Sequence, residues 1–114
     1  MRYQLTRKAV ADLRAIHKRS IIEWGELQAD QYLENLYAAI VRLAEHPERD
    51  KSRNRRASPF RMVPAQKHFL IYEIIDEKIV LVLAALHQAQ NIEKHIAELT
   101  PSARQAISAI KREP

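Results

Sequence analysis

Five side chains in the second half of the sequence carry the functional groups that cleavage of an RNA backbone would need. Attack of a 2′-hydroxyl on the adjacent phosphate needs a base to take its proton, an acid to protonate the leaving 5′ oxygen and a cation to stabilise the charged transition state. A guanidinium can bind phosphate through two parallel hydrogen bonds, and a histidine ring titrates near neutral pH. The candidate set for this chemistry is Arg61, Lys67, His68, Tyr72 and His87.

Each of these residues also has a purely structural interpretation. His87 follows a predicted strand, where a ring commonly forms a hydrogen bond with the backbone, and His68 could face solvent. Tyr72 could pack its ring in the core with its hydroxyl at the edge. Arg61 alternates with the apolar residues on either side of it, so it should point away from their face and be exposed. The residue types therefore leave open a catalytic site and a set of structural or partner-contacting side chains.

The positive charge of the chain is concentrated in one segment. The 114 residues carry a formal net charge of +5, and residues 49–61 hold six positive side chains against one negative. Such a basic cluster favours an acidic partner, either nucleic acid or the acidic face of a protein. A solvated loop without a partner is the alternative. The residues expected to bind a target or partner are Arg53, Arg55, Arg56, Arg61 and His87.

Hydrophobic periodicity predicts an N-terminal strand followed by two amphipathic helices. The predicted elements are a strand at 2–5, a helix at 7–24 and a helix from about Leu27 to Pro47. Thr6 is a good N-cap for the first helix, and Gly25 suits a left-handed C-cap at its end. The apolar face of the first helix comprises Val10, Leu13, Ile16, Ile21 and Trp24. Two helices joined by little more than one glycine should form an antiparallel helical hairpin.

The second half of the chain changes to the two-residue period of strands. The predicted strands comprise residues 60–63, 68–75 and 78–86. Residues 79–86 are apolar throughout, which predicts a central strand buried on both faces, with the helical hairpin on one side. Asn91 begins a third helix, and Thr100 and Pro101 favour the start of a separate tail helix.

The fold class is therefore α+β: an N-terminal strand, an antiparallel helical hairpin, a three-stranded antiparallel meander and a C-terminal helix, in the order β-α-α-β-β-β-α, plus a short tail helix. We expect an antiparallel sheet packed by helices. The length suits one domain, which we place at residues 1–99. The tail helix at residues 100–114 is either part of that domain or appended to it.

Composition excludes several classes of function. The sequence has no cysteine, so it offers no disulfide, thiolate nucleophile or thiolate metal ligand. A single glycine excludes a glycine-rich phosphate loop, and the spacing of His87 and His95 is unfavourable for a shared metal ion. No apolar run approaches a membrane span, and the N-terminus lacks the pattern of a signal peptide. We therefore expect a cytoplasmic protein with no metal, no cofactor and no membrane partner.

Four stretches of the chain resemble the RelE/ParE superfamily of bacterial toxins, and its ParE branch in particular. They are residues 9–16 (AVADLRAI), Trp24 and Gly25 with Gln28, Ala29 and Tyr32, residues 43–47 (LAEHP), and Arg61 with residues 68–72 and 86–87. The resemblance covers about residues 3–96 and lies in the order and separation of these stretches. The tail after Leu99 lies outside it.

The resemblance implies the toxin of a type II toxin–antitoxin system, neutralised by a cognate antitoxin that is acidic and partly disordered. Such a chain could form homo-oligomers or hetero-oligomers with its antitoxin. Members of the ParE branch poison DNA gyrase, and members of the RelE branch cut mRNA on the ribosome. The expected function is a ParE-like toxin that inhibits gyrase by binding, with no catalytic residues. The alternatives are a RelE-like endoribonuclease, and a non-toxic nucleic-acid-binding or decayed toxin domain.

Two departures from the RNase pattern favour the gyrase-binding interpretation. Some family RNases end the last strand in a His-Tyr pair, whereas Gln88 follows His87 in this chain. Glutamine cannot act as a general acid. Many RelE-like members also present lysines near the second strand, and only Lys51 and Lys67 lie near it in this sequence, both in predicted loops.

Overall fold

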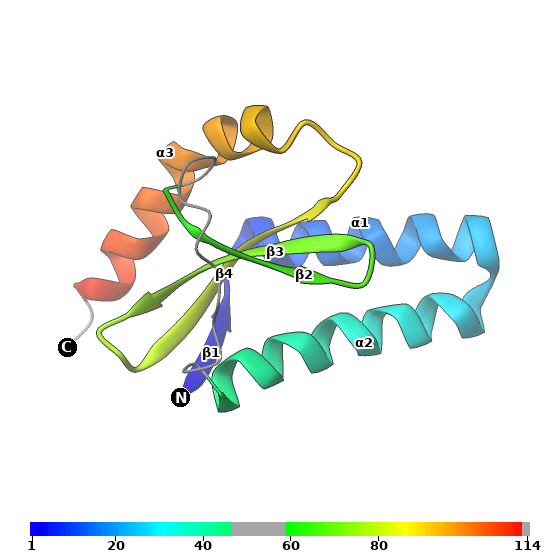
Figure 1. Ribbon diagram of the computed structural model, residues 1–114, viewed down its shortest axis with the longest axis horizontal. Coiled ribbons are helices and arrows are strands. Elements are labelled where there is room, and N and C mark those ends of the chain that lie inside the picture. Colours follow the sequence, from blue (N-terminus) through cyan, green and yellow to red (C-terminus); the bar gives the residue numbers. More distant parts are fainter. Residues whose placement is uncertain (47–58, 113–114) are drawn as a thin grey trace.

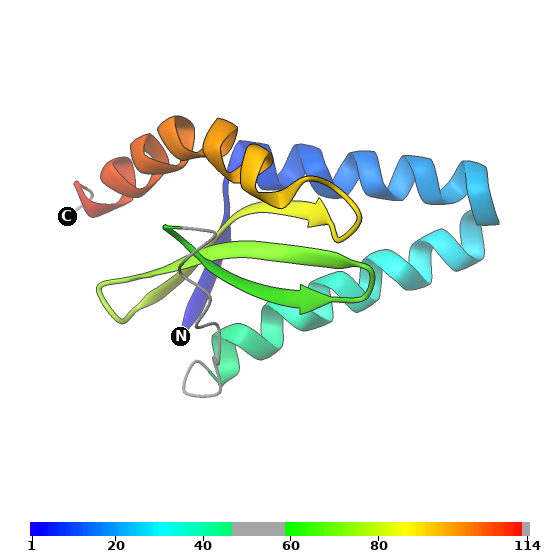
Figure 2. The same cartoon turned by 45° about the horizontal axis from the view of Figure 1, so that its top comes forward.

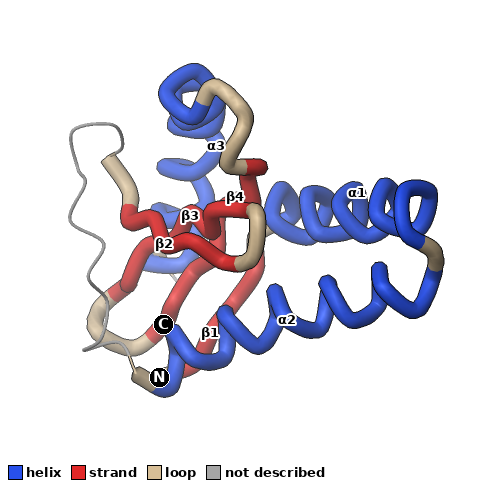
Figure 3. The backbone as a smooth tube through the Cα atoms, turned by 45° about the vertical axis from the view of Figure 1, so that its right-hand side comes forward, coloured by secondary structure: helices blue, strands red, loops and turns tan. Residues whose placement is uncertain are grey.

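Seven elements follow one another in the order that the sequence predicts, which confirms the α+β fold class (Figure 1). The computed structural model describes residues 1–46 and 59–112. The elements are β1 (Arg2–Leu5), α1 (Arg7–Trp24), α2 (Glu26–Glu45), β2 (Arg61–Ala65), β3 (His68–Ile75), β4 (Ile79–His87) and α3 (Ile92–Lys111). The pair α1 and α2 lies on one side of the sheet and α3 on the other (Figure 3).

The four strands form one mixed sheet in the order β1-β4-β3-β2. The antiparallel meander of β2, β3 and β4 is confirmed. The expectation that the whole sheet is antiparallel is wrong, because β1 pairs with β4 in parallel, with Arg2 opposite Ile79. Parallel strands need a long crossover connection, and α1, α2, β2 and β3 together form the connection between β1 and β4. Strand β4 is central, as its continuous apolar run predicts.

The junction between α1 and α2 depends on the one glycine in the chain. Thr6 caps α1 as expected, because its side chain accepts a hydrogen bond from the backbone N–H of Ala9. At the other end Gly25 has φ 88° and ψ 166°, and its N–H donates to the carbonyl of Ile21. The positive φ is as expected, but the ψ is extended and not that of a left-handed helix. This backbone region is almost confined to glycine.

Replacing Gly25 with alanine is expected to destabilise the fold by about 1–3 kcal/mol. A Cβ at this position would meet no atom within 4 Å, so the loss would come from backbone strain and not from a steric clash. Urea unfolding of the Gly25→Ala variant measures it. Gly25→Asn should lose a similar amount, because asparagine tolerates the left-handed helical region and not this extended one. Equal stability of wild type and the alanine variant would contradict the strained conformation.

One helix face differs from the sequence prediction. In α2 the expected apolar face is buried, with Leu36 and Ile40 both 0% exposed. In α1 the face continues only as far as Ser20, and Trp24 is 44% exposed. The reason is visible in Figure 1, where the joined ends of α1 and α2 extend beyond the strands and leave the last turn of α1 without a sheet to cover it.

The sheet separates two cores, and a β-bulge divides the side chains of β4 between them. Val80, Val82 and Ala85 pack toward the helical hairpin, and Leu81, Leu83, Ala84 and Leu86 pack toward α3. Leu83 and Ala84 are consecutive but face α3 together, because the pairing of β4 with β3 shifts register there. Ile71 lies opposite Ala84, and Tyr72 lies opposite Val82. The shift turns the end of β4 so that His87, two residues after Ala85, lies on the hairpin side.

The separate tail helix that Thr100 and Pro101 predict does not form, because α3 is one continuous helix with Pro101 inside it. The Thr100 hydroxyl donates to the carbonyl of Ile96 instead of capping a new helix. Proline in a helix interior costs about 3 kcal/mol. The apolar spacing continues through it, however, and Ile96, Leu99 and Ala103 are all buried against the sheet. Figure 2 shows that α3 runs along the sheet, and continuous burial of its apolar face offsets the proline.

No helix within residues 1–46 and 59–112 combines the length and the apolar content needed to cross a membrane.

Candidate functional site

Two of the predicted site residues meet where β3 begins and β4 ends. His68 and His87 lie directly opposite each other in the antiparallel pair, with ring centroids 5.0 Å apart and ring planes at 79°. Tyr32 of α2 lies against the other side of His68, with ring centroids 5.6 Å apart. We name Tyr32, Lys67, His68 and His87 the histidine cluster. It joins the sheet to the helical hairpin.

Hydrogen bonds tie His68 to the helical hairpin. The Tyr32 hydroxyl oxygen lies 2.6 Å from Nδ1 of His68, and it accepts a hydrogen bond of 2.9 Å from the backbone N–H of Lys67. Which of the two groups donates in the Tyr32–His68 bond depends on the tautomer of the ring. In either tautomer Nδ1 of His68 is engaged by Tyr32, which leaves only Nε2 for another partner.

Burial makes His68 neutral at physiological pH. The residue is 9% exposed, which corrects the expectation that it could face solvent. Its pKa is lowered from 6.5 to about 4, chiefly by burial and secondarily by the nearby His87, while Asp12 acts in the opposite direction. A neutral imidazole whose protonation is this unfavourable cannot serve as a general acid near pH 7.

His87 is exposed but is held by its own backbone turn. Its Nδ1 accepts a hydrogen bond of 3.0 Å from the N–H of Ala89, and its own N–H donates to Oε1 of Gln90 at 2.7 Å. These are the backbone bonds that the structural interpretation of a strand-end histidine predicts. Only Nε2 of His87 is left for a partner from solvent.

Lys67 is directed toward the helical hairpin. It lies in the turn between β2 and β3, and its Nζ is 5.6 Å from the centre of the Trp24 ring. A cation over an indole face is attracted by about 0.5–1 kcal/mol at an exposed site. The same residue therefore fixes the turn twice, through its N–H to Tyr32 and through its ammonium to Trp24.

The remaining candidates do not join the histidine cluster. Tyr72 is 0% exposed in the core beneath the hairpin, and its pairing with Arg61 lies at the far end of β2 from His68. The expectation that Arg61 is exposed is wrong, because its side chain is only 28% exposed and its Nε donates to Oε1 of Glu73 at 3.1 Å. Arg61 is less exposed than expected because the Glu73 carboxylate on the neighbouring strand holds its side chain against the edge of the sheet. Arg53, Arg55 and Arg56 lie outside the residues that the structure describes.

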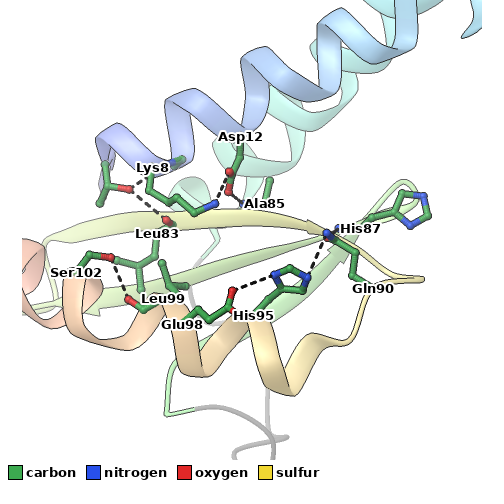
Figure 4. A network of polar contacts seen from close by, with 12 residues as sticks. Lys8, Asp12, Leu83, Ala85, His87, Gln90, His95, Glu98, Leu99 and Ser102 are labelled. Carbon is green, nitrogen blue, oxygen red and sulfur yellow. Dashed lines mark hydrogen bonds and ion pairs between the residues drawn. The ribbon is translucent and has the colours of Figure 1, made fainter.

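Sequence reasoning missed Asp12, which organises the polar network beside β4 (Figure 4). Its Oδ2 accepts the N–H of Ala85 at 3.0 Å, and its Oδ1 forms an ion pair with Lys8. The Thr6 hydroxyl donates to the carbonyl of Leu83 at 3.2 Å. Strand β1 ends opposite Val82 and does not pair with the later residues of β4. The side chains of Thr6 and Asp12 therefore form hydrogen bonds with the backbone groups of β4 that β1 leaves unpaired. Only the position of Asp12 in a family-like stretch could have indicated this.

Replacing Asp12 with alanine is expected to cost about 1–3 kcal/mol, because it leaves the N–H of Ala85 without its partner. Asp12→Asn is the matched control, since its amide oxygen can still accept that hydrogen bond. We expect the asparagine variant to retain more than half of the lost stability in thermal unfolding. Equal losses in both variants would assign the effect to charge and not to the hydrogen bond.

The family-like stretches of the sequence converge in space. Asp12 comes from the first stretch, Trp24 and Tyr32 from the second, and His68 and His87 from the fourth, and all five lie between the hairpin and one end of the sheet. The third stretch contributes Leu43 and Ala44 to the core beneath the hairpin. The resemblance therefore rests on residues that join the hairpin to the sheet.

No group of three or more side chains in the described part of the chain is arranged to hold a metal ion. A second polar group beside β4 joins Gln90, His95 and Glu98, with 3.4 Å between Nε2 of Gln90 and Nε2 of His95 and 3.8 Å between Nδ1 of His95 and Oε2 of Glu98 (Figure 4). These bonds hold the loop after β4 against the first turns of α3.

Comparisons with known proteins agree with this architecture. Residues 3–92 match the family described as the ParE toxin of the type II toxin–antitoxin system parDE. Toxin ParE1 of Mycobacterium tuberculosis is 32% identical over 95 residues, which cover 83% of this chain and 97% of that protein. Toxin ParE of Escherichia coli is 34% identical over 98 residues, covering 84% and 93%.

Solved structures share the fold. A chain from the chromosomal ParDE toxin–antitoxin system of P. aeruginosa superposes with a TM-score of 0.66 at 19% identity, covering 76% of this chain and 95% of that one. A mutant of E. coli toxin RelE in the free state gives a TM-score of 0.58 at 17% identity, covering 85% and 94%. With the family match over most of its length and relatives above 30% identity, the chain belongs to the ParE toxin family of type II toxin–antitoxin systems.

Proposed function

We propose that this chain is a toxin that inhibits DNA gyrase by binding to it, without catalysis, and that a cognate antitoxin neutralises it. The observation that carries the non-catalytic part is the placement of the five RNase candidates. Tyr72 is buried, Arg61 is paired with Glu73, and His68 is buried with its Nδ1 bonded to Tyr32. Among the described residues, the five candidates therefore do not gather as a base, an acid and a phosphate-binding cation around one reacting group.

Membership of the ParE family supports gyrase as the target, because this is the activity that the ParE branch implies. An enzyme bound to chromosomal DNA is reached from the cytoplasm, so the proposed site of action is cytoplasmic. The fold supplies a packed scaffold for this purpose, because its sheet is covered on both faces. Binding to a large target needs a stable surface and no chemistry of its own.

The proposed antitoxin is acidic and partly disordered before it binds. The net charge of +5 favours association with an acidic chain and raises the rate of encounter. Arg53, Arg55 and Arg56 remain proposed contacts, together with Arg61 and His87. An acidic segment that folds as it binds would cover a large area of the toxin.

Induction of the chain alone in a bacterial host tests the proposal. We expect growth arrest with altered plasmid supercoiling and a DNA-damage response, while protein synthesis continues at first. His87→Gln and Arg61→Gln should arrest growth as wild type does. An immediate halt of protein synthesis with cleaved mRNA, lost in His87→Gln, would establish the RNase function instead. Absence of arrest would indicate a decayed toxin.

A further inference from the structure

An open pocket lies at the edge of the fold where the C-terminal half of α3 passes the beginning of β2. It has a cavity volume of about 520 Å³, within the range of pockets that hold a ligand. Its apolar lining comprises Pro59, Phe60, Ile74 and Ile107. In Figure 2 the C-terminal half of α3 (orange to red) lies at the same end of the sheet as the beginning of β2 (green). The helical wall of this pocket lies beyond residue 92, where the family match ends.

The polar rim of the pocket is positively charged. Arg104, Ser108 and Lys111 line it from α3, and all three are exposed. They are four and three residues apart, so they lie on one face of the helix. Among the described residues neither Arg104 nor Lys111 forms an ion pair. The one acidic residue in the lining, Glu73, is already paired with Arg61. The rim therefore offers two cations that no described acidic side chain compensates.

We propose that this pocket binds an acidic segment of the cognate antitoxin that places one apolar side chain on the floor and two carboxylates on the rim. The inference rests on the proposed toxin–antitoxin function and names a surface for it. Lys111 lies seven positions after Arg104, which corresponds to about 10 Å along the helix axis. In an extended segment, carboxylates four residues apart share one face about 13 Å apart, with the apolar side chain between them on the same face, and the long arginine and lysine side chains can bridge that span.

The chemistry of the pocket favours a peptide over nucleic acid. Phosphate groups would use the two cations but would make no favourable contact with the apolar side chains of Ile74 and Ile107. An acidic peptide with an aliphatic or aromatic side chain satisfies both parts. The helical wall is supplied by a segment outside the family match, so the pocket would contribute to the choice of antitoxin.

The test measures binding of the full chain to the purified protein encoded beside its gene. Arg104→Glu with Lys111→Glu should weaken that binding at least about tenfold at low salt, and less at high salt. Lys18→Glu with Lys94→Glu is the matched control, because it makes the same charge change at exposed residues outside the pocket and should lower affinity far less. Ser108→Trp, which fills the pocket without adding charge, should also weaken binding.

The possible results separate the two proposals. If the neighbouring protein binds wild type and the Arg104/Lys111 variant equally, the pocket proposal is overturned and the toxin–antitoxin function stands. If the neighbouring protein does not bind the wild-type chain at all, both proposals fail. If binding of a short DNA or RNA duplex depends on Arg104 and Lys111 while binding of the neighbouring protein does not, the pocket is a nucleic-acid site and the inference is wrong. Thermal unfolding of each variant confirms that it is folded.

Discussion

Replacing Leu36 with alanine is expected to destabilise the fold by roughly 2–5 kcal/mol. Leu36 is 0% exposed and belongs to the core cluster between the helical hairpin and the sheet. The substitution removes buried methyl groups and leaves a cavity, since helices held by a hairpin on a twisted sheet cannot close the space fully. Urea unfolding with the slope held in common measures the loss.

Leu27→Ala is the matched control on the same helix. Leu27 is 89% exposed near the joined ends of α1 and α2, so the same chemical change should alter stability by less than about 0.5 kcal/mol. A small effect of Leu36→Ala, or equal effects at both positions, would mean that the buried face of α2 is assigned wrongly.

Acidification is expected to destabilise the fold through His68. Its pKa is lowered to about 4 in the folded chain from 6.5, so the unfolded chain binds the proton more strongly between these values. The stabilisation from neutral His68 is complete above pH 6.5 and is lost as the pH falls toward 4. The shift corresponds to as much as about 3 kcal/mol in total, of which about 2 kcal/mol is lost by pH 5.

Denaturant unfolding at pH 7.5, 6.0 and 5.0 measures this dependence. Side-chain carboxylates titrate mainly below pH 5, so the change in stability between pH 7.5 and pH 5.0 comes mainly from histidine side chains. His68→Gln should be less stable than wild type at pH 7.5, yet lose much less stability on acidification. A wild-type slope in His68→Gln would assign the pH dependence to another group.

The elements could be predicted from sequence because each has a strong local signal. The 3.6-residue period and Thr6 define α1, and the apolar run before His87 identifies β4 as central. Local signals failed where tertiary packing decides the outcome. Pro101 with Thr100 reads as a helix start, but an uninterrupted apolar face on the sheet keeps α3 continuous. The parallel pairing of β1 is likewise decided by topology.

The histidine cluster was only partly predictable. His68 and His87 were recognised as candidates, but their environment depends on Tyr32, which lies 36 residues earlier than His68 in the chain. Nothing in the local sequence shows that Tyr32 forms a hydrogen bond with His68 or that Asp12 accepts one from Ala85. Arg61 was expected to be exposed because the alternation of polar and apolar residues predicts which face a side chain lies on. It does not predict the partner on the neighbouring strand, which for Arg61 is Glu73.

A supercoiling assay with purified DNA gyrase tests the central claim most directly. The purified chain is titrated into gyrase with relaxed plasmid, beside a reaction that contains ribosomes and mRNA. We expect dose-dependent inhibition of gyrase, equal in wild type and His87→Gln, and intact mRNA. Unimpaired gyrase at saturating chain, together with ribosome-dependent cleavage of mRNA that His87→Gln abolishes, would contradict the proposal.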